Sequence, residues 1–241
     1  MCLAPLREVS RIPVCSRCLH APEALSAEFF CVCCRTPFVN ERPLDEQGRC
    51  ALCRLGLNGF DGAYCFGPYE GKLRELIHLF KYEGVRTLAG PLGAWITSAA
   101  PRTERFDLVT PMPLHWWRKW RRGFNQSDLL ARAVARSLGV PMAAPLHRRK
   151  ATLSQAGLTN AQRRTNVAGA FRLRRGASVT GLRVLLVDDV MTTGATASAC
   201  ASALKRAGAA HVSVLTLARA DRRMWTPAEP AGRRRVAAGV M

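Results

Sequence analysis

Two apolar runs of strand length lie near the C-terminal end of the chain, with a helical pattern between them. The first run covers residues 184–187 and the second covers residues 211–217. Because Val and Leu dominate without polar alternation, each run predicts a strand that is covered on both faces, as in a parallel α/β sheet. The Ala-rich stretch between them predicts a helix that ends at Gly208. The order strand, loop, helix, strand therefore predicts a parallel α/β unit over residues 184–219.

Two earlier stretches have helical periodicity. Apolar residues recur at i, i+3, i+4 and i+7 from position 73 to position 80, which predicts one apolar helix face. Charged residues of this helix, among them Lys81, fall off that face, and the sequence assigns them no chemistry. A second helix is expected over residues 127–138, with these side chains turned inward: Leu130, Val134 and Leu138.

The loop after the first strand combines two acids with glycine and hydroxyl residues. Asp188 and Asp189 end the strand, and residues 190–196 follow. Free N–H groups and the positive end of the helix dipole make such a loop an anion site. The two carboxylates would repel a phosphate, but they suit diol hydroxyls or a divalent metal. The pattern predicts a ligand with a phosphate on one side and a sugar diol or metal on the other; the alternative is an acid pair that only caps a loop.

The strand, the Asp pair and the TTGAT loop resemble the phosphate-and-ribose loop of type I phosphoribosyltransferases, and with its flanking segments the chain is similar to the ComF family. The resemblance implies an α/β fold of the type I phosphoribosyltransferase kind, in which helices flank a mainly parallel central sheet, with a small N-terminal zinc-ribbon module. It also implies phosphoribosyl pyrophosphate as the ligand and Mg²⁺ as the cofactor. Asp188 and Asp189 would be the catalytic acids and would orient the ribose hydroxyls or their metal. The residues that would surround the 5-phosphate are Val190, Met191, Thr192, Thr193, Gly194, Ala195 and Thr196.

A short strand is expected over residues 107–110, and the segment after it is expected to bind the diphosphate. By resemblance, the loop after this strand holds the pyrophosphate at Leu114 and His115. Arg122 lies in the segment RGFNQ, which matches the family, and guanidinium groups bind phosphate oxygens in pairs. The other basic residues nearby either contact the diphosphate or are solvated. Three tryptophans either pack under the loop or stack on a base: Trp116, Trp117 and Trp120.

A polar, basic stretch over residues 149–166 suits a flap over a phosphate site and resembles the flexible loop of the family. Its candidates for contact with the ligand are Lys150, Gln155, Arg163, Arg164 and Asn166. The alternative for Arg163 and Arg164 is that both face water on a helix.

Eight of the ten cysteines lie within the first 53 residues, and six of these form Cys-x-x-Cys pairs. Without a secretion signal, this clustering favours metal binding over disulfides. Two such pairs with fifteen residues between them have zinc-ribbon spacing and predict a tetrahedral site with these ligands: Cys31, Cys34, Cys50 and Cys53. Cys15 and Cys18 have only Cys2 upstream as a further ligand, so either a first zinc site is degraded or the true start lies upstream of Met1. Cys33 is expected to be a spare thiol.

Length and charge add limits. The 241 residues give room for one full domain and a small module. We expect a cysteine-rich module over residues 1–57, a phosphoribosyltransferase-like domain over 58–220 and a disordered basic tail over 221–241. The net charge is +19, and residues 117–175 carry fourteen Lys or Arg against one acid. The lack of a long apolar run and of a signal core predicts a cytoplasmic protein without membrane insertion.

The resemblance implies a transferase that moves a phosphoribosyl group to an acceptor that the sequence does not identify. One alternative is a non-catalytic module in which the same pocket only senses its ligand. Another is a ComF-type accessory protein for DNA uptake in natural transformation, which binds single-stranded DNA or proteins of the competence machinery. Charge alone does not separate a phosphate-rich ligand from a nucleic acid.

Overall fold

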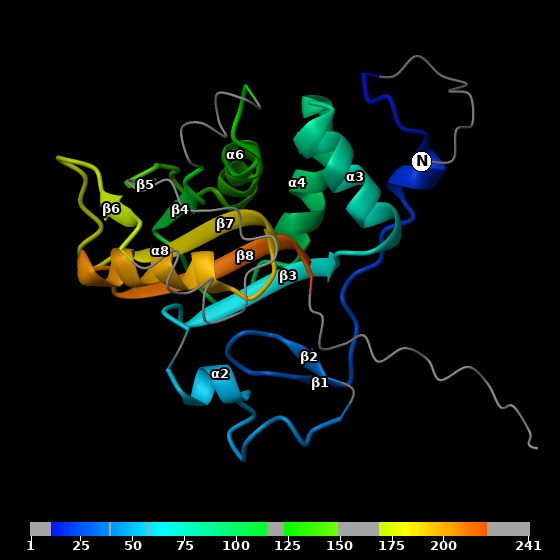
Figure 1. Cartoon of the computed structure of the whole chain (residues 1–241). Coiled ribbons are helices and arrows are strands. Elements are labelled where there is room, and N and C mark those ends of the chain that lie inside the picture. Colours follow the sequence, from blue (N-terminus) through cyan, green and yellow to red (C-terminus); the bar gives the residue numbers. More distant parts are fainter. Residues whose placement is uncertain (1–10, 39, 57, 115–122, 149–168, 221–241) are drawn as a thin grey trace, which may run out of the picture.

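A parallel sheet of four strands forms the centre of the molecule, in the order β3-β8-β7-β4. The computed structural model describes residues 11–38, 40–56, 58–114, 123–148 and 169–220. The strands of the sheet are β3 (Gly62–Pro68), β8 (His211–Arg219), β7 (Arg183–Met191) and β4 (Leu108–Pro111). Figure 1 shows helices on both faces of this sheet. The expected α/β class with a central parallel sheet is therefore confirmed.

The helices divide between the two faces. One face carries α3 (Gly71–Tyr82), the 3-10 turn η1 (Arg86–Leu88), α4 (Ala89–Ser98) and α6 (Gln126–Leu138). The other face carries α8 (Ala195–Arg206), beside the antiparallel strands β5 (Leu146–Arg148) and β6 (Phe171–Leu173). The expected apolar face of α3 is confirmed, since all four of its members are buried: Leu73, Leu76, Ile77 and Phe80.

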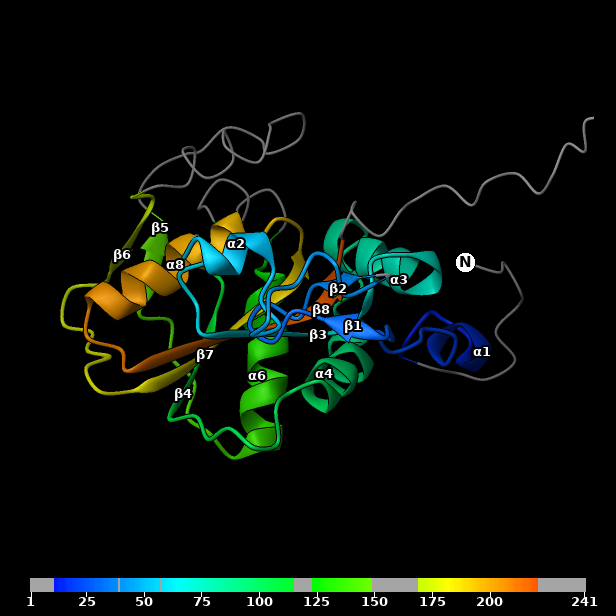
Figure 2. The same cartoon turned by 90° about the horizontal axis from the view of Figure 1, so that it is seen from below.

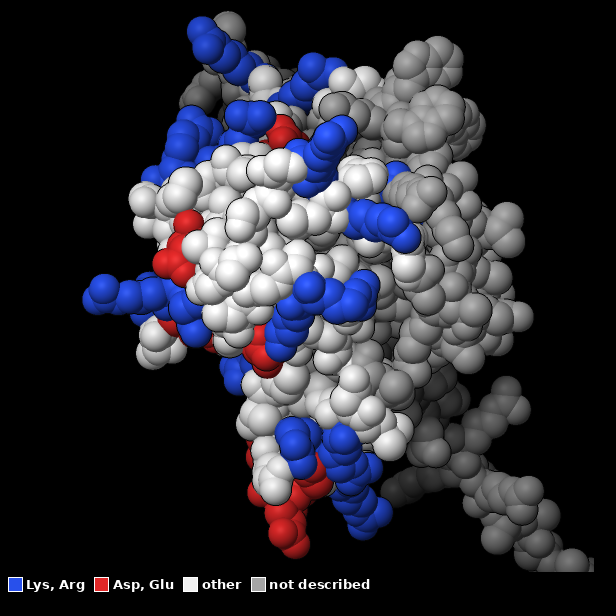
Figure 3. Space-filling model, turned by 90° about the vertical axis from the view of Figure 1, so that its left-hand side faces the viewer, with Lys and Arg blue, Asp and Glu red and all other residues white. Residues whose placement is uncertain are grey.

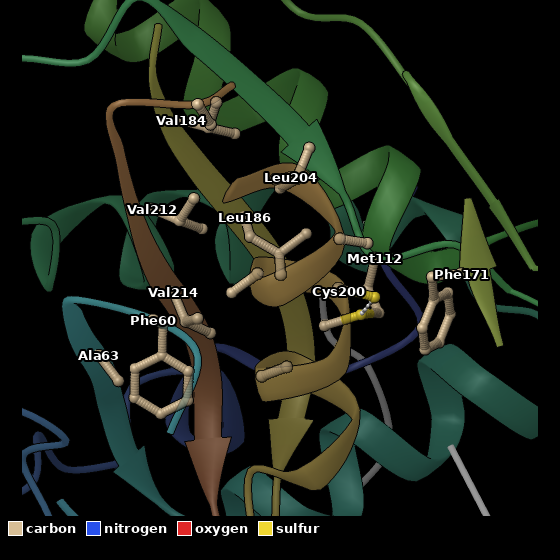
Figure 4. Packing of buried hydrophobic residues seen from close by; sticks show 14 of the residues in the cluster. Phe60, Ala63, Met112, Phe171, Val184, Leu186, Cys200, Leu204, Val212 and Val214 are labelled. Carbon is tan, nitrogen blue, oxygen red and sulfur yellow. Dashed lines mark hydrogen bonds between the residues drawn. The ribbon is translucent and has the colours of Figure 1, made fainter. Parts of the chain in front are cut away.

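The apolar sequence of β7 follows from burial on both faces of the sheet. Leu186 packs under α8 with Cys200 and Leu204, as Figure 4 shows. Leu185 and Val187 point the other way and join the cluster formed with α3, α4 and α6. Because successive strand residues face opposite sides, only a strand between two layers of helices takes such an uninterrupted run.

Most of the cysteine-rich segment lies against the edge of the sheet at β3 (Figures 1 and 2), with β1 (Phe29–Phe30), β2 (Pro37–Phe38) and α2 (Ala51–Arg54). Its first helix, α1 (Ser16–Leu19), lies instead on the side of α3, where Cys18 joins the core formed with α3 and α4. Leu25 donates its N–H to the Phe66 carbonyl, and Ala63 donates to the Cys33 carbonyl. These bonds satisfy part of the edge of β3, which an open sheet would leave exposed.

Two expectations are corrected. Leu138 was expected to face inward, but it is 37% exposed because it is the last residue of α6 and lies beyond the packed turns. The strand expected to end at residue 187 continues as β7 through the acid pair to Met191. No described helix is long and apolar enough to cross a membrane.

Candidate functional site

Two carboxylates lie near the carboxyl end of β7, the edge at which open parallel sheets bind their ligands. The Nζ atom of Lys81 lies 2.8 Å from Oδ1 of Asp189. The Ser127 hydroxyl donates a hydrogen bond of 2.8 Å to Oδ1 of Asp188. Lys81 belongs to the last turn of α3 and Ser127 to the first turn of α6. Two helices that are distant in sequence therefore converge on the acids.

Burial and charge act strongly on Asp188 and on Lys81. Burial and the charge of Asp189 raise the pKa of Asp188 to about 7, against the opposing effects of Lys81 and Ser127. Burial alone would lower the pKa of Lys81, but the charges of Asp189 and Asp188 outweigh it and raise that pKa above the value of a free lysine. The site therefore combines a lysine held in its charged form by the two acids and a carboxyl group whose protonated form is favoured by burial.

One glycine shapes the loop after the acids. Gly194 has a φ of +74°, a left-handed conformation that residues with a Cβ disfavour, and α8 begins at the next residue. The first turn of α8 thus starts directly from the loop, with backbone N–H groups that have no partner within the helix. A cavity of about 290 Å³ lies here, lined by the loop and by Tyr69, Lys81, Asp188 and Thr216.

A second cavity of about 250 Å³ adjoins the acids. Lys81, Asp188 and Thr196 line both cavities. The other residues that line the second cavity are Tyr82, Met112, Pro113, Leu114, Gln126, Ser127, Arg148 and Asp189. A single ligand that fills both cavities would therefore pass beside Asp188 and Lys81.

Most of the loop residues predicted from the sequence meet in the first cavity. They are Val190, Met191, Thr192, Gly194, Ala195 and Thr196. Leu114 lines the second cavity, and Thr193 accepts the N–H of Ala195 through Oγ1 at 3.4 Å. Other predicted contacts lie outside the described residues: His115, Trp116, Trp117, Trp120, Arg122, Lys150, Gln155, Arg163, Arg164 and Asn166.

The side chains that the sequence did not identify include Tyr69, Lys81, Ser127 and Arg148. Each lies far from the motif in sequence and joins the lining of the cavities only through tertiary packing. The sequence pointed to one of them only indirectly, because Lys81 lies outside the apolar face of its helix.

Four cysteines form a separate cluster, whose sulfur atoms all lie within 4.8 Å of one another: Cys31, Cys34, Cys50 and Cys53. The Cys31 and Cys53 sulfurs are 3.6 Å apart, as are those of Cys34 and Cys50. Tetrahedral Zn²⁺ with Zn–S bonds of about 2.3 Å requires sulfurs about 3.8 Å apart. The cluster therefore suits a structural zinc, as the spacing of the Cys-x-x-Cys pairs predicted.

The remaining N-terminal cysteines stand apart from this cluster. Cys18 is buried and Cys15 partly buried, both against the core formed with α3 and α4. Within the described part of the chain, neither belongs to a group of side chains that could hold a metal. Cys2 lies outside that part, so the degraded or truncated first zinc site stays a prediction. Cys33 donates its thiol proton to the Asp61 carbonyl and is not one of the four clustered ligands.

Known proteins resemble the chain over most of its length. The model of the phosphoribosyl transferase domain matches residues 126–233. Competence protein F of Haemophilus influenzae is 36% identical over 180 residues, which cover 71% of this chain and 78% of that protein. DNA utilization protein YhgH of Salmonella typhimurium is 31% identical over 226 residues, which cover 91% of this chain and 95% of that protein. Glutamine phosphoribosylpyrophosphate amidotransferase of B. subtilis covers 54% of this chain and 26% of its own, with 25% identity and a TM-score of 0.38.

The parallel sheet and the matched domain define a phosphoribosyltransferase-like protein with the type I fold. The cysteine cluster at its N-terminal side fits the zinc module expected beside that domain. With relatives that extend across both parts, the chain belongs to the ComF family.

Proposed function

We propose that this protein binds phosphoribosyl pyrophosphate with Mg²⁺ and transfers the phosphoribosyl group to an acceptor. The observation that carries the proposal is the position of Asp188, which lines both cavities. Phosphoribosyl pyrophosphate carries a phosphate, a diol and a diphosphate in that order around one ribose. The glycine loop, the acid pair and the cavity after β4 offer complementary groups in the same order.

The 5-phosphate is assigned to the first cavity. Residues 190–196 supply threonine hydroxyls and backbone N–H groups, and the N-terminus of α8 adds the positive end of a helix dipole. The left-handed Gly194 lets the backbone turn into α8 at this point. These features favour a phosphate over a neutral group.

The diphosphate is assigned to the second cavity. Arg148 and Lys81 line it with positive charge, and Leu114 follows β4 there. Guanidinium and ammonium groups bind phosphate oxygens through charge-assisted hydrogen bonds. Four further contacts remain proposals from the sequence: His115, Arg122, Lys150 and Arg163.

Magnesium fits the donors at the acid pair. Mg²⁺ takes oxygen ligands, typically from one or two carboxylates together with substrate phosphates and water. Since Oδ1 of Asp189 is paired with Lys81, the remaining oxygens of the two acids would hold the ion. A bound Mg²⁺ would neutralise charge on the diphosphate.

The proposed transfer breaks the bond between ribose C1 and the diphosphate oxygen, and the electron pair leaves with the diphosphate. Positive charge develops on the ribose, and the carboxylates of Asp188 and Asp189 beside its hydroxyls stabilise that charge. Lys81 and Arg148 stabilise the departing diphosphate. A lone pair of the acceptor then forms the new bond to C1, and the proton that the acceptor loses passes to the departing diphosphate or to water.

Calorimetry with fragments of the ligand tests this assignment. With Mg²⁺ present, we expect ribose 5-phosphate and pyrophosphate each to bind, and phosphoribosyl pyrophosphate to bind more tightly than either. Ribose 5-phosphate should also compete with the whole ligand. If the whole ligand does not bind, the proposal is wrong. Release of pyrophosphate in the presence of amine or nucleobase acceptors then separates a transferase from a module that only binds.

A second function is favoured by the charge and by the names of the relatives. Two relatives are called competence protein F and DNA utilization protein. The net charge is +19, and Figure 3 shows a face on which Lys and Arg outnumber Asp and Glu. As the alternative, we propose an accessory role in DNA uptake through binding of single-stranded DNA. A steep salt dependence of such binding that persists after substitution of Asp188 and Asp189 would favour this function.

A further inference from the structure

The cysteine cluster is linked to the phosphate loop through two separate routes of intervening residues. Its buried members share one hydrophobic cluster with Met191 and Ala195 of the loop. This contact is not implied by the sequence, because a zinc ribbon at one end of a chain has no fixed position relative to a domain that follows it.

The first route runs through Arg219, the last residue of β8, which is only 6% exposed. Its Nη1 donates to the Cys34 carbonyl at 2.7 Å, and its Nη2 donates to Oγ1 of Thr36 at 2.5 Å. That hydroxyl lies 2.9 Å from the Cys34 sulfur. A buried guanidinium requires compensating charge. Four thiolates around Zn²⁺ have a net double negative charge, so the zinc-loaded cluster supplies the charge that compensates the guanidinium of Arg219.

The backbone of Arg219 continues this route to the ligand cavity. Its carbonyl accepts the N–H of Tyr69 at 2.8 Å, and its register partner on β7 is Met191. The next residue, Ala220, donates its N–H to the Met191 carbonyl at 2.9 Å. Tyr69 and Met191 both line the cavity assigned to the 5-phosphate. One arginine thus contacts a zinc ligand and holds two walls of the cavity.

The second route follows the chain from the cluster. Asn58 donates to the Cys53 sulfur at 3.0 Å, and Gly59 donates its N–H to Oγ of Ser198 in α8 at 2.8 Å. A Cβ on Gly59 would overlap Ser202 and lie 2.6 Å from the Ser198 carbonyl oxygen, so only glycine fits this approach.

Phe60 completes this second route. It is 4% exposed and lies in the hydrophobic cluster that also contains Cys31, Cys34 and Cys50, and Figure 4 shows it beside Val214. Its ring atoms lie within van der Waals range of the site that a Cβ on Gly194 would occupy. Gly194, which shapes the phosphate loop, is therefore packed against Phe60, which follows directly after the zinc module.

We infer that the zinc-loaded cysteine cluster holds the phosphate loop in its binding conformation, with Arg219, Gly59 and Phe60 as positioning residues. The inference rests on the proposed function for the nature of the ligand, but its structural part does not need a ligand. Bound zinc fixes the positions of Cys34 and Cys53, at which the two routes begin. Loss of the metal makes both residues more mobile, and the start of α8 becomes less ordered.

Hydrogen exchange on the full chain tests the structural part without any ligand. Removal of zinc with a chelator is expected to accelerate amide exchange of residues 191–197 about tenfold, the equivalent of roughly 1.4 kcal/mol in the free energy of local opening. Residues 108–110 of β4, at the opposite edge of the sheet, should stay unchanged. Unchanged exchange in the loop would overturn the inference. Equal acceleration in β4 would also overturn it, because zinc would then stabilise the whole domain.

Arg219→Met tests the first route, with Arg54→Met as the matched control because Arg54 is exposed on α2 of the same segment. We expect Arg219→Met to keep its zinc and to bind ribose 5-phosphate about tenfold more weakly, the equivalent of roughly 1.4 kcal/mol, whereas Arg54→Met binds as the wild type does. If Arg219→Met does not fold, Gly59→Ala takes the same measurements, because it removes no cysteine of the cluster and no side chain that lines the cavity.

The outcomes separate the two claims. If a folded Arg219→Met or Gly59→Ala variant binds ribose 5-phosphate as tightly as the wild type, the inference is wrong and the proposed function stands. If the wild type itself does not bind ribose 5-phosphate or phosphoribosyl pyrophosphate, the proposed function is wrong. The exchange of residues 191–197 then decides the inference alone.

Discussion

The ammonium group of Lys81 lies 2.8 Å from Oδ1 of Asp189, and the two side chains are only 13% and 11% exposed. The pair joins the end of α3 to the end of β7, more than a hundred positions later in the chain. It places a fixed positive charge beside two acids before any metal or ligand arrives. Part of the repulsion between the carboxylates is therefore already offset in the ligand-free molecule.

Lys81→Met should destabilise the protein by about 3 kcal/mol at pH 8, because a buried pair that loses one partner leaves an uncompensated charge. The control is Lys72→Met on the same helix, whose partly exposed pair with Glu75 is worth about 0.5 kcal/mol or less. Urea unfolding of both variants measures the difference. Equal stabilities would mean that the Lys81–Asp189 pair does not persist in solution.

The raised pKa of Asp188 makes stability depend on pH. Its folded pKa is about 7, against about 4 for an unfolded Asp, so the folded protein binds the proton more tightly. Ionisation of Asp188 therefore lowers the stability of the folded protein. This loss of stability is absent below the pKa of the unfolded state and complete above the pKa of the folded state. Stability relative to Asp188→Asn should therefore rise by about 2–3 kcal/mol from pH 8 to pH 5.

Urea unfolding of wild type and Asp188→Asn at pH 5, 6, 7 and 8 measures this dependence. Taking the difference between the two proteins removes the contributions of other titrating groups. A difference that is flat across this range, or that falls toward pH 5, would contradict the assignment of the raised pKa to Asp188.

Ser127→Ala should cost about 2 kcal/mol of stability at pH 8, where Asp188 is ionised, because a buried hydrogen bond to a charged group is lost. Ser137→Ala is the control, since Ser137 is exposed on the same helix. Affinity for the ligand should fall along with stability, because the Asp188 carboxylate is no longer held in place. A variant with unchanged stability and affinity would show that the hydroxyl does not position Asp188.

Gly194→Ala tests the conformation of the phosphate loop. A Cβ there would meet its neighbours at 3.7 Å or more, so space is not the obstacle. The left-handed φ of +74° would cost a residue with a Cβ about 1–2 kcal/mol. We expect binding of ribose 5-phosphate to weaken about tenfold, the equivalent of roughly 1.4 kcal/mol.

Gly90→Ala provides the comparison for this variant. Gly90 lies in α4 with open space around the position of a Cβ, and its φ lies outside the left-handed region. Alanine there should stabilise the protein by about 0.5–1 kcal/mol and leave binding unchanged. If Gly194→Ala binds ribose 5-phosphate as tightly as the wild type, the left-handed conformation of Gly194 is not required for binding.

The elements with local signals were predictable from the sequence. The apolar run at 184–187 and the spacing from Leu73 to Phe80 reflect burial that each segment experiences along its own length. The acid pair and the glycine loop were found for the same reason, because β7, the loop and the start of α8 are contiguous.

The side chains that complete the site were not predictable in the same way. Which of the charged residues on α3 faces the acids depends on how that helix packs on the sheet, and periodicity only shows that Lys81 lies off the core face. Ser127 reaches Asp188 through the placement of α6. Arg219 looks like an ordinary end of a strand until the cysteine segment folds back against it.

The affinity of the Asp188→Asn/Asp189→Asn variant for phosphoribosyl pyrophosphate with Mg²⁺, measured by calorimetry, tests the central claim most directly. Asp128→Asn, an acid on the surface of α6, serves as the control. We expect the control to bind normally and the double variant to bind at least about a hundredfold more weakly, the equivalent of losing two hydrogen bonds to charged groups. A folded double variant with unchanged affinity would contradict the account of the site.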